Sequence, residues 1–261
     1  MIGSIIGDII GSIYEFKNFK NETFEPLFRS ECSYTDDSIL TVATARAILD
    51  GSSYASKYKE FGNKYKPEVG RYGSGFRDWL KATDSTCYNS YGNGSAMRVS
   101  PVGFAFNDIE TVLEEAKKSA ECSHNHPEGI KGAQATALAI LMARNNSTKE
   151  EIKKEISSRF DYNLNRTCDE IRPNYKFDSS CQGTVPEAII AFIESNSYEN
   201  AVRKAISLGG DSDTMACITG GIAQAFYKEI PKDIVERGLS TVPEDMMKTI
   251  EEFNKVYCVV F

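Results

Sequence analysis

Six consecutive residues, Gly209-Gly210-Asp211-Ser212-Asp213-Thr214, constrain this chain more than any other stretch. They stand between two segments with apolar residues at helical spacing, residues 198–208 and 215–227. A glycine pair ends a helix readily, because a residue without Cβ adopts the left-handed turn at little cost. Carboxylates then favour the start of the next helix, where backbone N–H groups lack partners and the helix dipole is positive. The stretch therefore predicts two helices joined at a tight acidic corner.

Two interpretations of this corner are open. The simpler one is that the aspartates cap the second helix, but a cap needs only one oxygen acceptor and four oxygen-bearing side chains follow one another here. A second cluster, Thr35-Asp36-Asp37, also stands directly before an apolar helical pattern. Two such clusters indicate one shared site of hard oxygen ligands, which suits Mg²⁺ or Mn²⁺.

The composition excludes several classes of protein. With 41% hydrophobic and 26% charged residues among 261, the chain is an ordinary globular protein that can bury a sizeable core. The formal net charge of −7 argues against a broad nucleic-acid-binding surface. The seven cysteines are dispersed and never in C-x-x-C spacing, which favours the reducing cytoplasm over a disulfide framework or a zinc site. The apolar N-terminus lacks the basic residues of a signal peptide, and no stretch is long enough to cross a membrane.

The first helix is predicted over residues 2–16, where six isoleucines indicate burial on most sides. Gly3, Gly7 and Gly11 recur at every fourth position of this segment. Residues of that size on one helix face would let a neighbouring helix approach closely. In a chain without a membrane span, this spacing is typical of helix packing inside a core.

Asp8, Ser12 and Glu15 share another face of the same predicted helix. A polar stripe on an apolar helix is costly to bury unless its groups find partners. It is therefore either a solvated edge or the lining of a pocket. The polar and aromatic residues 17–34 that follow are expected to form a loop over this helix end.

Apolar periodicity, capping residues and proline positions predict the remaining helices. They cover residues 36–50, 54–65, 76–82, 108–122, 127–144, 148–160, 184–193, 198–208 and 215–227, and Pro231 and Pro243 open two more. Turns are expected at Pro67, Gly70, Gly73 and Gly75, and residues 161–182 are expected to form a long ordered loop.

No alternating strand pattern extends beyond three or four residues, and the chain has no repeat and no low-complexity linker. The predicted fold class is therefore all-α. We expect residues 1–261 to form one domain, a single compact orthogonal multi-helix bundle with a dinuclear metal site at its centre. The helices at 2–16, at 36–50 and after Asp213 would form its buried middle.

A glycine-rich turn, Gly92-Asn93-Gly94, enters the helical pattern that begins at Ser95. Such a turn exposes several N–H groups and can cradle a phosphate, although most G-N-G turns are only turns. The two histidines of the chain, His124 and His126, lie together before a helix that Pro127 opens. A hydrogen-bonding cap is the usual role of a histidine in that position.

Five motifs taken together resemble the ADP-ribosylglycohydrolase family, which includes the dinitrogenase-reductase-activating glycohydrolase and the ADP-ribosyl-acceptor hydrolases. The motifs are Gly7-Asp8-x-x-Gly11-Ser12-x-Tyr14-Glu15, Thr35-Asp36-Asp37-Ser38, Gly92-Asn93-Gly94-Ser95-Ala96-Met97-Arg98, Ser123-His124 and the Gly209–Thr214 stretch. They occur in order over nearly the whole chain, and their joint occurrence is specific although each motif alone is weak. The resemblance implies an all-helical fold around two Mg²⁺ or Mn²⁺ ions. It also implies cleavage of the bond between the terminal ribose of an ADP-ribosyl group and its acceptor.

The resemblance also implies roles for individual residues. The implied metal ligands are Thr35, Asp36, Asp37, Asp211, Asp213 and Thr214. The implied substrate-binding residues are Gly92, Asn93, Gly94, Ser95, Ala96, Met97 and Arg98, which match a diphosphate loop, together with His124; His126 has no match. Glu15 and Asp37 are candidates for the carboxylate that activates water or protonates the leaving group. Four converging aspartates carry −4, which two divalent cations would balance.

The expected substrate is an ADP-ribosylated protein or a small ADP-ribose conjugate, and the protein is expected to be a cytoplasmic monomer. One alternative is a catalytically idle member that binds ADP-ribose or serves as a structural protein, as the eye-lens crystallins of the family do. Another keeps the metals but hydrolyses phosphate esters, although no cluster of basic residues stands beside the aspartates. The acceptor stays open among arginine, serine, an acetyl ester and a nucleobase.

Overall fold

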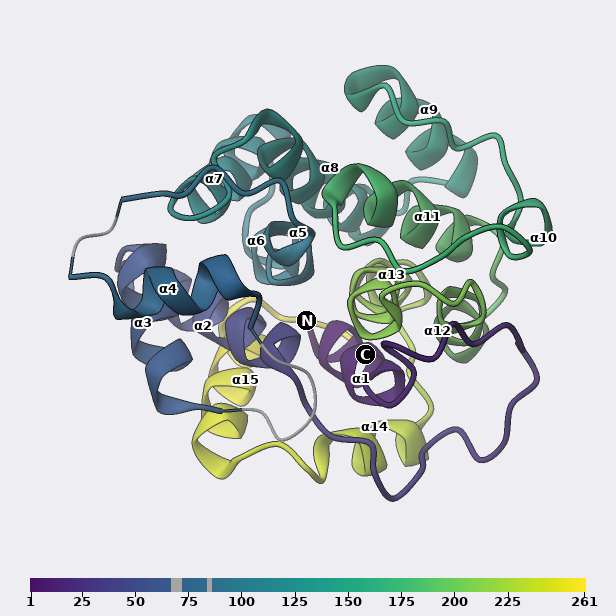
Figure 1. Ribbon diagram of the computed structural model, residues 1–261, viewed down its shortest axis with the longest axis horizontal. Coiled ribbons are helices and arrows are strands. Elements are labelled where there is room, and N and C mark those ends of the chain that lie inside the picture. Colours follow the sequence, from purple (N-terminus) through teal and green to yellow (C-terminus); the bar gives the residue numbers. More distant parts are fainter. Residues whose placement is uncertain (67–71, 84–85) are drawn as a thin grey trace.

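The computed structural model describes residues 1–66, 72–83 and 86–261 (Figure 1). These residues form helices and loops without a sheet, and one isolated β-bridge joins Gly92 to Ser180. The prediction of an all-α multi-helix bundle is thereby confirmed. The turns expected at Pro67 and Gly70 lie outside the described residues.

Two apolar helices lie against each other at the centre of the molecule, α1 (Ile2–Gly11) and α13 (Ser212–Tyr227) (Figure 1). Every residue of α1 is buried, and so is α13 except at its last two residues. The glycines of α1 allow this approach, because a Cβ at Gly7 would lie 2.1 Å from the carbonyl oxygen of Ala216. The sequence prediction that the glycine spacing serves close helix packing is confirmed.

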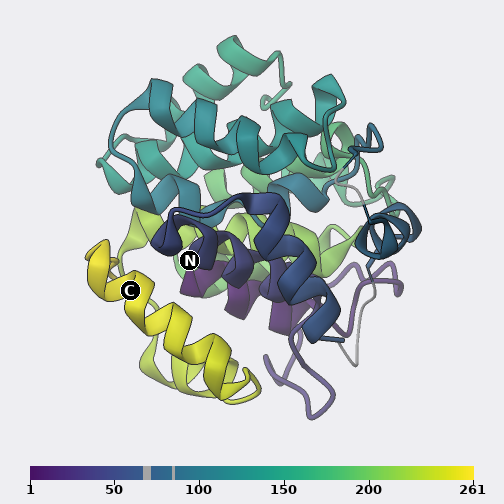
Figure 2. The same ribbon diagram turned by 90° about the vertical axis from the view of Figure 1, so that its left-hand side faces the viewer.

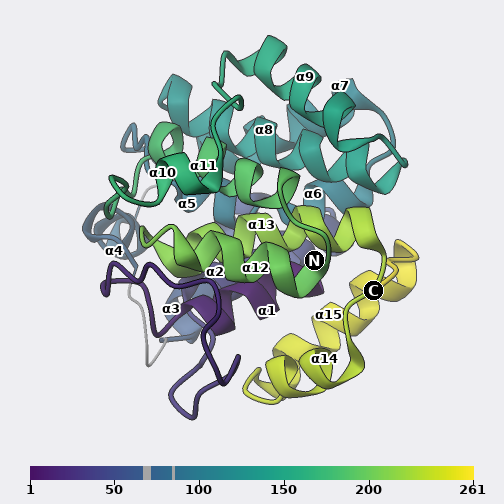
Figure 3. The same cartoon turned by 90° about the vertical axis from the view of Figure 1, so that its right-hand side faces the viewer.

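The other helices surround this central pair. They are α2 (Asp36–Asp50), α3 (Tyr54–Lys64), α4 (Ser74–Lys81), α5 (Gly94–Met97), α6 (Ser100–Ala105), α7 (Ile109–Glu121), α8 (Pro127–Arg144), α9 (Lys149–Phe160), α10 (Cys168–Ile171), α11 (Cys181–Ile193), α12 (Tyr198–Ser207), α14 (Lys232–Leu239) and α15 (Glu244–Val256). Helices α8, α11 and α12 pack on α13, whereas α2 and α14 pack on α1. Figure 2 shows α2 and α3 on the face opposite to the one that α11 and α12 form in Figure 3. None of the described helices has the length and apolarity needed to cross a membrane.

The first helix is shorter than predicted, because it ends at Gly11 and not at residue 16. Ser12 donates its hydroxyl to the carbonyl of Ile9 at 2.8 Å, and the chain then turns. The turn lets Tyr14 bury its ring, whose centroid lies 4.5 Å from that of Phe19 in the following loop. Glu15 therefore stands on a turn and not on a helix face.

The prediction of one long loop over residues 161–182 is also wrong. Thr167 and Glu170 form a capping box that starts the short helix α10. Ser180 accepts a hydrogen bond from the backbone N–H of Gly183 and so starts α11 at Cys181, three residues before the predicted Thr184. Pro186 consequently lies inside α11 and does not mark its beginning.

Candidate active site

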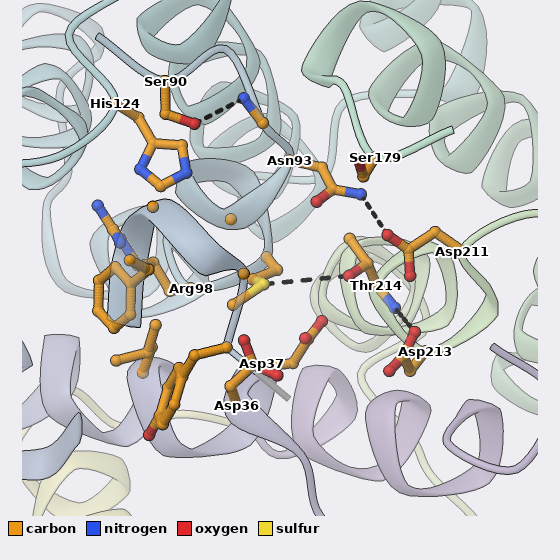
Figure 4. Close-up of a pocket in the computed structure, with 18 of the residues that line it drawn as sticks. Asp36, Asp37, Ser90, Asn93, Arg98, His124, Ser179, Asp211, Asp213 and Thr214 are labelled. Atoms are coloured by element: carbon orange, nitrogen blue, oxygen red, sulfur yellow. Dashed lines mark hydrogen bonds between the residues drawn. The ribbon is translucent and has the colours of Figure 1, made fainter. Parts of the chain in front are cut away.

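Most of the polar residues singled out in the sequence line one cavity of about 490 Å³, whereas Asp8, Ser12 and Thr35 lie outside its lining. Its walls come from the turn after α1, the starts of α2, α4 and α13, and the loops before α5 and α11. Acidic side chains gather at the N-terminal ends of α2 and α13, whereas His124 and Arg98 lie on the other side of the cavity (Figure 4). The cavity thus has an acidic end and a separate end that includes Arg98 and His124.

The start of α2 places one group of carboxylates. Thr35 caps the helix by accepting a hydrogen bond from the N–H of Asp37 at 3.2 Å. Asp36 and Asp37 follow in the first turn and line the cavity. One oxygen of Asp37, Oδ1, is buried and has no hydrogen-bond partner among the described residues. A buried oxygen in that state is available for a ligand.

The start of α13 places the second group. Gly209 adopts the left-handed conformation with φ 69°, and a Cβ there would lie 2.6 Å from the carbonyl oxygen of Phe19. The glycine therefore permits the sharp corner that the sequence predicted. Asp211 stands at the N-cap but makes no capping bond with its side chain. Instead it accepts a hydrogen bond from Asn93 Nδ2 at 2.8 Å, across the cavity wall (Figure 4).

Carboxylate oxygens from three segments converge closely enough to hold metal ions. One group joins Asp8, Asp37 and Asp213, and a second joins Glu15, Asp211 and Asp213, with the oxygens of each group within 4.8 Å of one another. Asp213 belongs to both groups. Oxygen donors in this number are the ligand set that Mg²⁺ and Mn²⁺ prefer.

Burial and mutual repulsion raise the pKa of these carboxyls. Burial, followed by the charge of Asp8, raises the pKa of Asp36 to about 7. The pKa values of Asp37 and Asp213 lie well above their usual range, again through burial first and neighbouring carboxylates second. Burial and the charges of Asp211, Asp36 and Asp8 raise the pKa of Glu15 to about 8. These carboxyls cannot all be ionised at once without positive charge nearby, and bound divalent cations would supply that charge. The residues present therefore fit such ions.

Asp8, besides belonging to the first carboxylate group, holds the start of α2 through hydrogen bonds. Its Oδ1 accepts from Thr35 Oγ1 at 2.7 Å, and its Oδ2 accepts from the N–H groups of Thr35 at 3.0 Å and Ser38 at 3.1 Å and from the hydroxyl of Ser38. These bonds hold the α2 start in place, and Oδ1, which accepts only one of them, keeps a lone pair for the group with Asp37 and Asp213. In the sequence, Asp8 was marked by its position on the polar stripe of the first helix and by its place in the motif that begins at Gly7, but neither indicated this contact with α2.

The glycine-rich loop forms another wall of the cavity. Gly92, Asn93, Gly94, Met97 and Arg98 line it. Among the hydrogen bonds of the described residues, none uses the backbone N–H of Gly94 or Ser95, at the start of α5. The side chain of Ser95 turns away from the cavity and donates to the carbonyl of Gly129 at 2.7 Å. Ala96, likewise buried, does not line the cavity.

Arg98 and His124 form the far end of the cavity. Arg98 is fully buried, donates through Nη2 to the carbonyl of Ser119 and to Ser123 Oγ, both at 2.8 Å, and lies 4.1 Å from the ring centroid of Tyr58. Its Nε and Nη1 have no partner among the described residues. No carboxylate of the described residues forms an ion pair with this guanidinium, which makes it a fixed positive charge beside the cavity.

His124 is neutral, because burial and then the charge of Arg98 hold its pKa well below the usual range. Ser123 Oγ lies 2.8 Å from His124 Nδ1 and already accepts from Arg98. The hydroxyl proton of Ser123 is therefore free to be donated to Nδ1, which leaves the imidazole proton on Nε2. His126 caps α8 by accepting from the N–H of Glu128 and is not part of the cavity.

Aromatic side chains complete the cavity and were not singled out in the sequence. They are Phe16, Tyr72, Phe76, Tyr88 and Phe177. Phe16 and Phe177 are 75% and 47% exposed, and their ring centroids lie 5.3 Å apart at the rim. Nothing in the spacing of these residues distinguishes them from core aromatics, so only the structure reveals them.

Known proteins are similar to this chain over nearly its whole length. The sequence pattern of the ADP-ribosylglycohydrolase family matches residues 1–257. The ADP-ribosylhydrolase ARH3 of Homo sapiens is 25% identical, with 98% of this chain and 89% of the relative covered. The ARH3 proteins of Bos taurus and Gallus gallus are 25% and 24% identical, covering 98% and 99% of this chain and 88% and 92% of theirs.

A solved structure shares the fold. The chain described as an ADP-ribosylglycohydrolase-related protein complex superposes with a TM-score of 0.69 at 18% identity. The match covers 99% of this chain and 95% of that one.

Proposed function

Because this chain belongs to the ADP-ribosylglycohydrolase family, we propose that it is a metal-dependent hydrolase of the glycosidic bond between the terminal ribose of ADP-ribose and its acceptor. The observation that supports this proposal most strongly is the meeting of two carboxylate groups at Asp213, on the wall of a cavity large enough for a nucleotide. The substrate would be an ADP-ribosylated protein or a small ADP-ribose conjugate.

Two divalent cations, Mg²⁺ or Mn²⁺, are the proposed cofactors. Thr35, Asp36, Asp37, Asp211, Asp213 and Thr214 would hold them. Bound there, such ions would supply positive charge and Lewis acidity toward the ribose hydroxyls. Asp8 would keep Thr35 and the first turn of α2 in position through its hydrogen bonds.

The other cavity residues would bind and orient ADP-ribose. The free N–H groups of Gly94 and Ser95 suit the diphosphate, and Arg98 adds a permanent positive charge behind them. His124 would donate from Nε2 toward the same region. The aromatic walls would exclude water from the sugar.

Glu15 is the proposed acid or base, with Asp37 as the second candidate. The carboxyl of Glu15 lies beside Asp211 and Asp213, where the ribose end would be bound. Glycosidic cleavage needs a carboxyl group that protonates the leaving oxygen or nitrogen, or a carboxylate that activates water.

We further propose that residues 1–261 form one domain and act as a monomer in the cytoplasm. All seven cysteines are free, although four of them are buried, which suits a reducing compartment. Sedimentation of the purified protein tests the monomer.

The deciding experiment measures release of free ADP-ribose from a panel of arginine-linked, serine-linked and acetyl-ester conjugates. We expect turnover that requires Mg²⁺ or Mn²⁺ and that chelation abolishes. Asp36→Ala and Asp213→Ala should each abolish turnover while circular dichroism shows a folded protein. Full turnover with unchanged metal content in either variant would refute the shared site.

The same measurements separate the two alternatives. An idle, binding or structural member would bind ADP-ribose without releasing it from any conjugate. A phosphoesterase would release phosphate or AMP instead of intact ADP-ribose. The hydrolase proposal accounts for the site as described, and no observation on the described residues favours either alternative over it.

A further inference from the structure

A second hollow adjoins the cavity of the candidate active site. It has a volume of about 350 Å³ and is lined by Ser12, Ile13, Glu15, Phe16, Lys17, Arg29 and Glu31. We refer to it as the side groove. Glu15 and Phe16 line both hollows, so these two residues form the wall between them.

The position of this wall makes the side groove relevant to the reaction. The carboxyl of Glu15 belongs to the group with Asp211 and Asp213, so the bond to be cleaved would lie next to the wall. ADP-ribose would extend from there into the larger cavity, toward His124 and Arg98. The acceptor leaves from the other side of the same bond, and the side groove is the hollow that borders it.

Two cations of the side groove have no ion-pair partner among the described residues. Lys17 Nζ and the guanidinium carbon of Arg29 lie about 6 Å from the ring centroid of Tyr14, at 6.0 Å and 5.9 Å, and both side chains are exposed. By contrast, Glu25, in the same loop of residues 17–34, forms an ion pair with Arg203 of α12 at 2.9 Å. Among the described residues that line the groove, the acidic side chains are Glu15 and Glu31, and Glu31 accepts from Ser30 Oγ at 2.8 Å. Lys17 and Arg29 are thus available to a ligand.

Phe16 adds an apolar contact at the wall. It is 75% exposed and contacts Phe177 at the rim of the larger cavity. A polypeptide that crosses the rim would cover both rings. An exposed aromatic pair flanked by unpaired cations is a surface suited to a peptide with apolar and acidic side chains.

We propose that the side groove receives the acceptor polypeptide beside the modified residue, and that Lys17 and Arg29 select acceptors flanked by Asp or Glu. This inference rests on the proposed function, since it assumes that the ribose–acceptor bond lies at Glu15. Attraction between exposed opposite charges typically changes affinity by about two- to threefold per pair. Two such pairs predict a preference of about three- to tenfold, weakened by salt.

The test uses pairs of ADP-ribosylated peptides, serine-linked and arginine-linked, in which the flanking residues are either glutamate or lysine. A third substrate is an ADP-ribose conjugate with a small neutral leaving group, which cannot reach the groove. kcat/KM is measured for the wild type, for the double variant Lys17→Glu/Arg29→Glu, and for the control Lys154→Glu. Lys154 is exposed on α9, which Figures 1 and 3 place far from the loop of residues 17–34.

The wild type and Lys154→Glu should prefer the glutamate-flanked peptides by about three- to tenfold in kcat/KM, mainly through KM. The double variant should lose or reverse this preference while its kcat/KM on the small conjugate changes less than about twofold. The preference of the wild type should shrink as salt is raised from low to about 0.5 M.

Several results would overturn the proposal. One is equal kcat/KM of the wild type for the glutamate-flanked and lysine-flanked peptides; another is an equal effect of Lys154→Glu and the double variant on that preference. A third is a loss of kcat/KM in the double variant that is as large on the small conjugate as on the peptides. The last is turnover of the small conjugate with no turnover of any peptide. Absence of ADP-ribose release from every substrate would refute the proposed hydrolase activity, and this inference with it.

Discussion

At the starts of α2 and α13, the aspartate side chains do not serve as the N-cap hydrogen-bond acceptors. Thr35 caps α2, and Asp8 fixes Thr35, so that Asp36 and Asp37 are free to face the cavity. At α13 the N-cap residue Asp211 makes no capping bond with its side chain and bonds to Asn93 instead. The simple capping interpretation of the acidic corner is therefore wrong for Asp211.

A first prediction at this scale concerns Glu15. Glu15→Gln should lower kcat by about two to four powers of ten if its carboxyl acts as acid or base, because the amide cannot transfer a proton. Binding of free ADP-ribose should change little, since the amide keeps the shape and most hydrogen bonds. Turnover and calorimetric binding are measured on one preparation. Near wild-type turnover would remove Glu15 from the mechanism.

A second prediction concerns the glycine-rich loop. A Cβ at Gly94 would lie 2.9 Å from His124 Nε2, so Gly94→Val should displace the imidazole and block the N–H groups of the loop. We expect ADP-ribose affinity to fall by about tenfold or more, the equivalent of about 1.4 kcal/mol of overpacking. Metal affinity, measured by titration of the same sample, should stay unchanged. Equal loss of metal and ligand would show that the loop supports the whole site.

At the scale of helices, close contact between α1 and α13 organises the site. The glycines of α1 face α13 so closely that a Cβ at Gly11 would lie 2.5 Å from the carbonyl of Ser212. This approach brings Asp8 of α1 to the start of α2 and keeps the α13 start beside Glu15. Backbone proximity, and not only side-chain packing, therefore determines how the carboxylates meet.

Gly7→Ala tests this contact, because its Cβ would meet the Ala216 carbonyl at 2.1 Å. The free energy of unfolding should fall by about 1–3 kcal/mol or more, because overpacking a core costs about that much stability. Gly73→Ala is the matched control, since no atom of the described residues lies within 4 Å of a Cβ at Gly73. Urea unfolding compares the two variants. Equal stability would mean that α1 moves away from α13 without cost.

At the scale of the whole molecule, a concentration of negative charge lies at the centre of a chain with a formal net charge of −7. Among the described residues, the one fully buried guanidinium is that of Arg98, and it lies at the other end of the cavity. Without cations the folded state therefore retains protons that the unfolded chain releases. Stability must depend on pH and on metal together.

The sign of this dependence follows from the raised pKa values. In the unfolded chain these carboxyls ionise near pH about 4, whereas the folded pKa is about 7 for Asp36 and about 8 for Glu15. Their contribution to stability is complete below pH about 4 and is lost as pH rises through the folded values. The metal-free protein should lose stability from pH 5 to pH 8, and Mg²⁺ or Mn²⁺ should raise Tm more at pH 8 than at pH 5.

Thermal unfolding with chelator or with metal, at the two pH values, measures this coupling. The variant Asp37→Asn/Asp213→Asn serves as control, because it removes two of the buried carboxyls and should flatten both the pH dependence and the metal effect. A rise in Tm with metal that is equal at pH 5 and pH 8 would contradict the prediction.

Local patterns in the sequence determined the helices and much of the chemistry. Isoleucine and glycine spacing predicted a buried first helix with one face open to a close neighbour, and the Gly209–Thr214 corner predicted its own turn, because both follow from residue types within one short segment. Which helix packs on that face, α13, was not specified by the pattern. Tertiary structure alone decided what lies far apart in sequence. Asp8 bonds to Thr35, Asn93 bonds to Asp211, and Glu15 leaves the helix to join the carboxylates, because each depends on a partner that no local pattern specifies.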